Sequence, residues 1–354
     1  MVKFGTGGWR AIIGEEFTKE NIQKLTLAMC LKMKAEHKDT KSVVIGYDRR
    51  FLSKEAVIWA CQILGKEGIH VQFVNRSAPT PLLMFYVMKH ELDYGMMVTA
   101  SHNPAIYNGI KVFTYGGRDA DEIQTKDIEK WLLEAEKLYT PCHEEDGQMP
   151  PPSYTELVKQ GIVEEINPMN EYLDNILSVI NVDAIRKRDL RVAVDPMYGV
   201  SLTALSTILA VARCTVETIN AQHDTLFGGK MPAPTESTLR SLQNYVLDRY
   251  CDIGIATDGD ADRLGVIDDK GHYLHANTIL VMLYYYLLKY RGWRGPAVRN
   301  LSTTHVLDKV AESFGQKCYE VPVGFKYISA KMQETDAIIG GESSGGLTVK
   351  GHIH

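Results

Sequence analysis

Residues 253–263 read IGIATDGDADR, a short apolar run that ends in a loop of carboxylates. The same layout recurs along the chain: an apolar run, a polar or glycine-containing loop at its end, and then an amphipathic helical stretch. The other runs of this kind lie at 43–48, 96–102, 192–199 and 337–342. Strands that alternate with helices predict α/β layers with largely parallel sheets. In such folds ligands bind beyond the carboxyl ends of the strands, where these polar residues lie.

The composition is that of an ordinary globular protein. Of the 354 residues, 45% are hydrophobic and 23% are charged, and this length indicates two or three domains. The formal net charge of −5 gives no bulk attraction for nucleic acid or for an anionic membrane. An anionic substrate would therefore need local basic residues. The most apolar stretch, at 279–288, is too short to span a bilayer as a helix and is expected to be a buried helix.

The cysteine pattern favours reduced thiols. The six cysteines are scattered and form no CxxC pair, so neither a zinc site nor a disulfide framework fits their spacing. No apolar signal core is present in the N-terminal residues, MVKFGTGG. We therefore expect a cytoplasmic protein that does not engage a membrane.

The domain organisation is predicted from breaks in the pattern. A linker is expected at 141–154, which is rich in proline and acidic residues. A second boundary is expected at Cys251, where a new apolar run begins. These breaks predict an N-terminal α/β domain at 1–140, a second at 155–250 and a third at 251–354. We find no close sequence repeat, so a topology shared by the three units is a hypothesis.

The strongest local signal is the alternation of Asp258, Asp260 and Asp262. At a separation of about 5 Å and an effective dielectric constant of about 20, each pair of carboxylates repels by roughly 3 kcal/mol. Such a cluster needs a cation or full solvation. An extended loop lets the three side chains converge on one hard cation, Mg²⁺ or Ca²⁺. From this loop alone, a solvated acidic turn is an equally good explanation.

An EF-hand calcium loop is excluded by two positions. The sixth position of the segment is Arg263, where an EF-hand needs glycine, and the twelfth is Asp269, where it needs a bidentate glutamate. The carboxylates therefore indicate a metal site of another kind.

A second signal is TASHNP at residues 99–104. Ser101 follows an apolar strand and precedes a turn fixed by Asn-Pro, which places a hydroxyl at a strand end. Two alternatives stay open, a serine that caps its own turn and a hydrolase nucleophile. The GxSxG elbow is absent, and no third member of a triad is evident. We expect His102 to orient the loop and not to act as the base for Ser101.

Two glycine-rich segments could contact a ligand. GGESSGG at 340–346 offers close backbone approach, one carboxylate and several hydroxyls, which suit a polyhydroxylated ligand; a flexible surface turn is the alternative. GTGGWR at 5–10 lacks the ending of a P-loop, but its Arg10 could pair with a phosphate bidentately. Lys111 and Lys326 each allow a functional role or a solvated surface position.

Taken together and in this order, these four segments resemble the α-D-phosphohexomutase family, which includes the phosphoglucomutases and the phosphomannomutases. The matching segments are GTGGWR at 5–10, TASHNP at 99–104, DGDADR at 258–263 and GGESSGG at 340–346. The pairing of such a serine loop with such a carboxylate loop is very specific, and the resemblance covers essentially the whole chain. It implies consecutive α/β domains with mixed, largely parallel sheets around a central cleft, four of them in a full-length member.

The resemblance also implies roles for individual residues. Ser101 is similar to the serine that carries the transferable phosphoryl group, with His102 beside it, and Lys111 to the proposed general acid/base. The implied ligands of Mg²⁺ are Asp258, Asp260, Asp262 and an oxygen on Ser101. The implied cations beside the phosphoserine and the substrate are Arg10 and Arg263. The residues implied to bind the sugar hydroxyls are Glu342 and Ser344, and the implied substrate-contacting lysine is Lys326.

The implied reaction interconverts a hexose 1-phosphate and a hexose 6-phosphate, with glucose the expected hexose. Phospho-Ser101 donates to O6 of glucose 1-phosphate, the glucose 1,6-bisphosphate reorients, and its 1-phosphate returns to Ser101. Phosphoserine carries nearly two negative charges and the aspartates add three. One Mg²⁺ does not balance these charges, so Arg10, Arg263 and a lysine are needed nearby. Mannose and glucosamine phosphates stay open as substrates, because a loop that reads O3 and O4 does not sense C2.

One departure from the family pattern is expected to matter. A full-length member has a fourth domain that grips the non-reacting phosphate, and no counterpart is found because the sequence stops twelve residues after Glu342. We therefore expect a chain truncated at its C-terminus, with an incomplete third domain and low or absent turnover. The alternative function is a weak or inactive scaffold that binds sugar phosphates; a serine hydrolase has little support. The motifs do not predict the oligomeric state.

Overall fold

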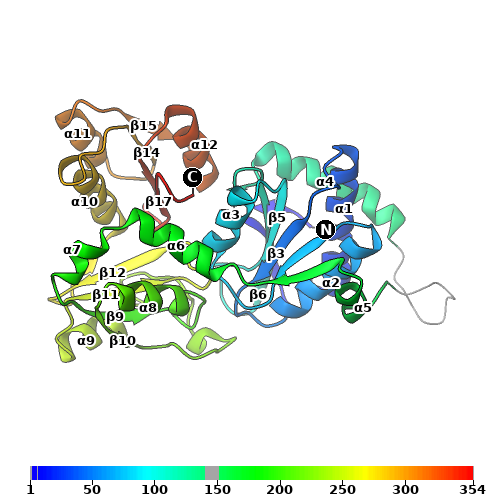
Figure 1. Ribbon diagram of the computed structural model, residues 1–354, viewed down its shortest axis with the longest axis horizontal. Helices are drawn as coiled ribbons and strands as arrows, with labels where there is room; N and C mark the ends of the chain where they lie inside the picture. Colours follow the sequence, from blue (N-terminus) through cyan, green and yellow to red (C-terminus); the bar gives the residue numbers. More distant parts are fainter. Residues whose placement is uncertain (1, 6, 140–150, 354) are drawn as a thin grey trace. The chain divides into compact units, whose positions relative to one another are not determined.

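The computed structural model describes residues 2–5, 7–139 and 151–353 (Figure 1). The chain divides into two compact units, Met1–Pro168 and Met169–His354. Most of the linker predicted at 141–154 lies outside the described residues.

The first unit is built on one mixed sheet with the strand order β1-β2-β6-β5-β3-β4-β8, and β7 pairs with β6. The strands are β1 (Phe4–Gly5), β2 (Gly8–Ile12), β3 (Val43–Tyr47), β4 (Val71–Val74), β5 (Tyr94–Val98), β6 (Tyr107–Thr114), β7 (Arg118–Asp119) and β8 (Val163–Ile166). The helices are α1 (Lys19–Ala35), α2 (Ser53–Lys66), α3 (Thr80–Lys89), α4 (Glu122–Leu138) and α5 (Tyr154–Lys159). Strands β5, β3, β4 and β8 are parallel, whereas β6 and β2 continue the sheet antiparallel.

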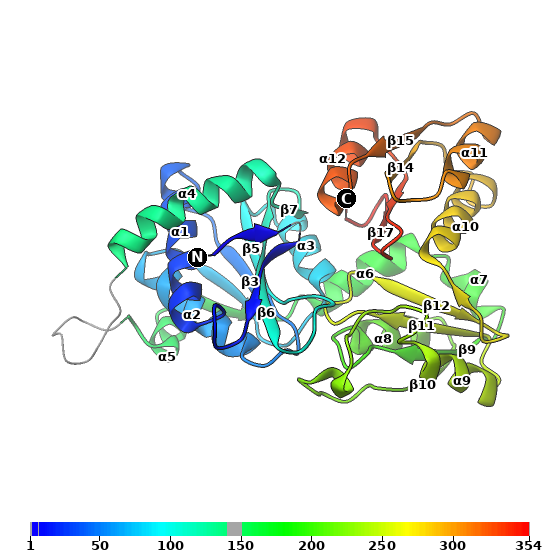
Figure 2. The ribbon, with the colours of Figure 1, turned by 180° about the vertical axis from the view of Figure 1, so that it is seen from behind.

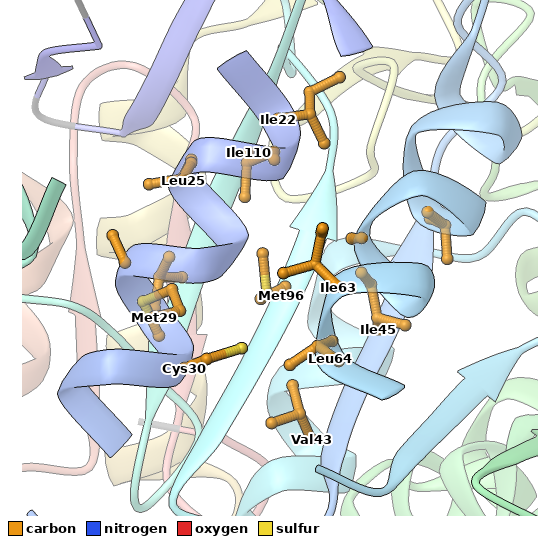
Figure 3. Close-up of a cluster of buried hydrophobic side chains, with 14 of the residues drawn as sticks. Ile22, Leu25, Met29, Cys30, Val43, Ile45, Ile63, Leu64, Met96 and Ile110 are labelled. Atoms are coloured by element: carbon orange, nitrogen blue, oxygen red, sulfur yellow. The ribbon is translucent and has the colours of Figure 1, made fainter. Parts of the chain in front are cut away.

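The core of the first unit follows from the alternation along its strands. Val43 and Ile45 point into the cluster beneath α1 and α2 (Figure 3), and α1 packs against α4 (Figure 2). Gly46 points to the opposite face, where a Cβ atom would come within 2.8 Å of Leu83 on α3. Helices therefore cover both faces, as expected for parallel strands.

The connections of the first sheet reverse direction beside β3. The chain passes from β3 through α2 to β4 on one side, and then through α3 to β5 on the other side of β3. At such a reversal the loops that leave the two neighbouring parallel strands diverge, which leaves room for a ligand. Asp48 follows β3, and the loop with Ser101 follows β5, so both lie at this point.

The second unit contains two sheets, with the strand orders β10-β9-β11-β12-β13 and β15-β14-β16-β17. The first of them comprises β9 (Arg191–Asp195), β10 (Thr215–Thr218), β11 (Ile253–Thr257), β12 (Leu264–Asp268) and β13 (Tyr273–Leu274), and the second β14 (Ala297–Asn300), β15 (Cys318–Val321), β16 (Ile339–Gly341) and β17 (Leu347–Val349). The helices are α6 (Met169–Val179), α7 (Val182–Arg186), α8 (Leu202–Val211), the 3₁₀ turn η2 (Phe227–Gly229), α9 (Arg240–Asp248), α10 (Ala276–Lys289), α11 (Val306–Ser313) and α12 (Phe325–Thr335).

One topology occurs in all three sheets. In each, four strands form two parallel pairs and one antiparallel pair in equivalent places, and the orders β6-β5-β3-β4, β12-β11-β9-β10 and β17-β16-β14-β15 correspond strand by strand. Within each, a strand, a helix, a second strand, a second helix and a third strand follow one another. The prediction of three α/β domains with mixed sheets is confirmed, and their topology is shared although their sequences show no close repeat.

The sheets divide the chain differently from the predicted boundaries at 155 and 251. Helix α5 and strand β8 belong with the first sheet, where β8 pairs with β4. Strands β11 and β12 belong with the second sheet, where β11 pairs with β9. We therefore propose that the first domain runs to the end of β8 and that the third begins with α10. Strand pairing decides this, and the local breaks in the sequence do not report it.

Helix α10 covers the stretch that was expected to be a buried helix. Leu280 and Tyr284 are buried, but Met282 and Tyr285 are exposed, so the helix is buried on one side. Among the described residues no helix is long and apolar enough to cross a membrane. The described cysteines, Cys30, Cys61, Cys214, Cys251 and Cys318, are free.

Candidate active site

The serine loop, residues 99–106 between β5 and β6, holds Ser101 in an unusual backbone conformation. Its φ angle is 52°, in the left-handed region that residues with a side chain rarely adopt. The Ser101 N–H donates to the Thr99 hydroxyl at 2.8 Å, and that hydroxyl donates to Asp48 at 2.7 Å. Asp48 follows β3 and Thr99 follows β5, so two parallel strands together fix the serine. Backbone strain of this kind persists only where neighbouring groups hold it.

Arg50 holds the rest of the serine loop. Its guanidinium lies 3.3 Å from the Asp48 carboxylate, and both side chains are completely buried. It donates at 2.6–2.9 Å to three carbonyl oxygens of the loop, those of Ser101, Asn103 and Pro104, and to that of Tyr107, the first residue of β6. A planar guanidinium can satisfy several acceptors at once in a fixed geometry. The loop is therefore fixed at its main chain by one buried ion pair.

Arg10, which the resemblance implies as a cation near the serine, lies beside this loop. It donates to the side-chain oxygen of Asn103 at 2.7 Å. Its neighbours on β2, Trp9 and Ala11, are buried in the core, so Arg10 points to the opposite face of the sheet.

Lys111 lies on β6 and is buried. Its neighbours Ile110 and Val112 also belong to the core beneath α1 and α2, so Lys111 points to the same face as Arg10. His102 lies next to the serine, with its Nδ1 3.3 Å from the Ser101 hydroxyl oxygen. The structure thus brings Ser101, His102 and Arg10 into one network within the first unit.

The carboxylate loop of the second unit converges as the sequence predicts. Asp258, Asp260 and Asp262 each offer one carboxylate oxygen, and these oxygens lie within 4.8 Å of one another. Asp258 and Asp260 are buried. One oxygen of Asp258 accepts the backbone N–H groups of Asp262 and Arg263 at 3.1 Å each, which closes the turn. Three carboxylates this close repel strongly without a counter-charge, so this donor set fits a divalent cation that prefers oxygen.

The loop after β9 packs against the carboxylate loop. The Val200 N–H donates to the carbonyl of Gly259 at 3.3 Å, and a Cβ atom at Gly199 would lie only 2.6 Å from that oxygen. Thr257 also donates to the hydroxyl of Ser201 at 2.7 Å. Glycine at 199 is therefore required for this close approach of two backbones.

The glycine-rich loop at 342–346 connects β16 to β17 and holds Glu342. The N–H of Glu342 donates to the carbonyl of Gly346 at 2.8 Å, and the Ser344 hydroxyl donates to the Glu342 carboxylate at 3.0 Å. The Leu264 N–H donates to the carbonyl of Gly345 at 3.2 Å. The carboxylate loop and the loop at residues 342–346, which we name the sugar loop after its predicted role, are therefore neighbours within the second unit.

Lys326 and Arg263 complete the predicted residues of the second unit. Lys326 lies in the first turn of α12, with its ammonium 5.2 Å from the centre of the Tyr327 ring. Arg263 ends the carboxylate loop, next to the segment that holds Gly345. Both are partly exposed, which is compatible with a ligand contact.

Four residues that hold these loops had no predicted role: Asp48, Arg50, Thr99 and Asn300, whose side-chain N–H donates to the Glu342 carboxylate at 2.9 Å. Asp48 carried the signal used for Ser101, a polar residue directly after an apolar run. Arg50 lies two residues after Asp48. Its role could have been inferred from the same signal only if β3 and β5 had been known to be neighbours. Asn300 ends a strand of four residues, and its sequence carries no comparable signal.

Comparisons with known proteins agree with this fold. Three family models match the chain, and their descriptions are phosphoglucomutase/phosphomannomutase α/β/α domain I at residues 1–138, domain II at 170–271 and domain III at 275–354.

Two curated relatives and one solved structure illustrate the similarity. A phosphoglucomutase/phosphomannomutase of Thermococcus kodakarensis is 31% identical over 347 residues, which is 97% of this chain and 72% of the relative. A phosphoglucosamine/phosphogalactosamine mutase of Sulfurisphaera tokodaii is 29% identical, over 99% of this chain and 73% of the relative. A crystal structure from Thermus thermophilus, described as a candidate phosphomannomutase, superposes with a TM-score of 0.86 at 28% identity, covering 99% of this chain and 76% of that one.

Proposed function

The chain belongs to the phosphoglucomutase/phosphomannomutase family of phosphohexomutases, and on that premise we propose that it interconverts hexose 1-phosphate and hexose 6-phosphate through a phosphorylated Ser101. The observation that carries the proposal is the serine loop. A left-handed Ser101 held by Thr99 and a loop fixed by Arg50 at four carbonyls are costly arrangements for a serine that merely caps a turn.

In the proposed reaction the protein positions and stabilises charge, because phosphoryl transfer needs little covalent help. The bond between phosphorus and the Ser101 oxygen breaks as a bond forms to O6 of the hexose 1-phosphate. Lys111 accepts the proton of the attacking hydroxyl and returns a proton to the serine oxygen. The bisphosphate then reorients and donates its 1-phosphate to Ser101.

Charge balance gives the cations their roles in this proposal. A phosphoserine carries a charge of about −1.5 to −2 at neutral pH. Arg10 contacts the serine loop by its hydrogen bond to Asn103. Asp258, Asp260 and Asp262 would hold Mg²⁺, which supplies charge neutralisation for the phosphoryl oxygens when bound. Arg263 and Lys326 would contact the phosphates of the substrate.

The proposed hexose is glucose, with glucose 1,6-bisphosphate as the activator that loads Ser101. The relatives carry names for glucose, mannose, glucosamine and galactosamine phosphates. Glucosamine 6-phosphate is therefore the substrate to test beside glucose 6-phosphate. Glu342 and Ser344 would read hydroxyls away from C2.

The intact mass of the protein tests this proposal directly. The chain is incubated with glucose 1,6-bisphosphate, with and without Mg²⁺. A gain of about 80 Da, one phosphoryl group, is expected only with Mg²⁺. The Ser101→Ala variant should not gain mass, and Thr99→Ser, which keeps the supporting hydroxyl, should still do so.

The same experiment separates the mutase from the alternative of a scaffold that only binds sugar phosphates. A scaffold would bind glucose 1,6-bisphosphate, as seen by calorimetry, without any gain of mass. That combination of binding without phosphorylation would rule out the proposed mutase activity for this chain.

A further inference from the structure

The carboxylate of Glu342 connects all three parallel strands of the third sheet. It follows β16, accepts the side-chain N–H of Asn300 at the end of β14 at 2.9 Å, and accepts the backbone N–H of Gly324, after β15, at 3.0 Å. Gly324 has a φ angle of 131°, which a residue with a side chain rarely adopts, and it begins the helix that carries Lys326. One acidic side chain therefore positions two loops that are candidates for substrate contact.

Asn300 is itself held from the other side. Its side chain is buried, with 1% of the residue exposed, and its oxygen accepts three donors. These are the backbone N–H and the hydroxyl of Ser302, at 3.1 and 2.9 Å, and the hydroxyl of Thr303, at 2.6 Å. Because the oxygen is fixed in this way, the amide nitrogen must point to Glu342, and the orientation of the amide is determined by its partners.

The two oxygens of the Glu342 carboxylate consequently differ. Both donors from buried or backbone groups, those of Asn300 and Gly324, go to Oε1. The donor to Oε2 is the hydroxyl of Ser344, an exposed residue whose hydroxyl can rotate. A carboxylate has about four acceptor positions. The donor to Oε2 is the Ser344 hydroxyl, which can rotate away when another donor approaches.

We propose that Asn300 is a positioning residue for hexose recognition: it holds Oε1 of Glu342 so that Oε2 accepts from a sugar hydroxyl. This role rests on the proposed function, because it requires that Glu342 contacts the sugar. The ligand chemistry it fits is a pair of neighbouring ring hydroxyls, which donate to the carboxylate and exchange bonds with Ser344.

A neutral amide suits this position for an electrostatic reason. An aspartate 2.9 Å from Glu342 would repel it, whereas a lysine or arginine would neutralise the carboxylate and compete with the sugar for its oxygens. An asparagine donates to Glu342 through its nitrogen and accepts from Ser302 and Thr303 through its oxygen. The carboxylate keeps its full charge for the ligand and still has a fixed orientation.

Replacement of Asn300 tests the role through selectivity and not through affinity alone. Asn300→Leu keeps the approximate shape and removes every hydrogen bond of the side chain. The affinities of the full chain for glucose 6-phosphate and for its C4 epimer, galactose 6-phosphate, are measured by calorimetry. We expect the ratio of the two affinities to fall about tenfold, because a carboxylate free to rotate no longer distinguishes the direction of one hydroxyl.

The matched control is Tyr284→Phe in the same domain. Tyr284 is fully buried and donates to the carbonyl of Gly295 at 3.0 Å, before the start of β14. This variant also loses a hydrogen bond of a buried side chain, and we expect it to keep the affinity ratio of the parent. A lower melting temperature with an unchanged ratio in Asn300→Leu would reduce Asn300 to a structural residue and overturn the proposal.

The outcome also separates this inference from the proposed function. If the parent chain binds and distinguishes the two sugars but Asn300→Leu does so equally well, only the role of Asn300 is wrong. If the parent chain binds neither sugar phosphate, the proposed function is overturned and the role of Asn300 with it.

Discussion

The serine loop and the sugar loop are each held by a residue from the end of a neighbouring parallel strand, but one support is an ion pair and the other is neutral. In both, the residue at the end of a neighbouring parallel strand reaches across to the loop: Asp48 from β3 to the serine loop after β5, and Asn300 from β14 to the sugar loop after β16. The serine loop has a buried ion pair, Asp48 with Arg50. The sugar loop has a neutral amide.

The difference follows from what each loop has to present. The guanidinium of Arg50 grips the backbone at four carbonyls, so the main chain of the serine loop is fixed whatever charge Ser101 carries. In the role that we propose, Asn300 holds a side chain whose carboxylate contacts the sugar, and it does so without an ion pair. A charged group in place of Asn300 would alter the acceptor it supports. The comparison teaches that shared topology fixes where a support comes from, while the chemistry of the loop decides its charge.

The largest effect should come from breaking the ion pair of the serine loop. Arg50→Met removes one partner of the buried Asp48–Arg50 pair, and such a removal typically destabilises by about 3–5 kcal/mol. With the one tryptophan of the second unit replaced (Trp293→Phe), the fluorescence of Trp9, Trp59 and Trp131, all in the first unit, should follow its unfolding in urea at a much lower midpoint. Gain of mass from glucose 1,6-bisphosphate should be abolished.

An unfolding midpoint close to that of the parent would mean that the ion pair is not what holds this loop. The second-unit variant Asn300→Leu is the control, because it should leave the tryptophan signal of the first unit unchanged.

A falling pH should destabilise the second unit before the first. Burial lowers the pKa of His352, in the second unit, to about 4. The native state then favours the neutral imidazole while the unfolded chain takes up a proton near pH 6.5, so the stability from this group is present above about pH 6.5 and is lost as the pH falls towards about 4. The loss amounts to at most about 3.4 kcal/mol.

In the first unit, burial tends to raise the pKa of Glu36, but the hydrogen bonds from Lys32 and Tyr94 outweigh it and the net shift is downward. That contribution is lost only below about pH 4.5. The second unit should therefore weaken first as the pH falls, and urea unfolding at several pH values should show it. His352→Gln should flatten the pH dependence between about 6.5 and 4; a profile identical to that of the parent would contradict this assignment.

A smaller effect is expected at Thr99. Thr99→Val keeps the shape and removes the hydroxyl between Asp48 and the Ser101 N–H, which should destabilise the first unit by about 1–3 kcal/mol. The rate of Ser101 phosphorylation should fall about tenfold, because the left-handed conformation loses one of its supports. Thr99→Ser should restore both values, and failure of this rescue would show that the methyl group and not the hydroxyl is what matters.

The smallest effect is expected on the rim of the sugar loop. Ser302→Ala removes one of the three donors to the Asn300 oxygen, and Ser302 is exposed. We expect the unfolding free energy of the second unit to change by less than about 1 kcal/mol. A loss of several kcal/mol would mean that Asn300 depends on this hydroxyl and that its support is not shared.

Much of the site could be predicted because its chemistry is local in sequence. Three aspartates within five residues can converge without help from distant segments, and the structure brings their oxygens together. Ser101 became a candidate because an apolar run precedes it and Asn-Pro follows it. Arg10 was placed beside the serine by resemblance, and its bond to Asn103 agrees with that expectation.

The supports of the site were missed because they join segments that are distant in sequence. Thr99 meets Asp48 across 51 residues, and Asn300 meets Glu342 across 42. Each contact depends on which strands are neighbours, and hydrophobic periodicity does not encode that. The same missing information explains why the predicted boundaries differ from the sheets to which β8 and β11 belong.

The sequence by itself determined the alternation of strands and helices, the identity of the charged and hydroxyl groups at the strand ends, and the family to which they belong. Those properties depend on residue type and short spacing, which are present in the chain before it folds. Only the tertiary structure decided which strands pair, and therefore that Asp48, Arg50 and Asn300 hold the loops. Pairing results from the burial of whole faces by helices that lie far away in the sequence, and no local pattern contains that information.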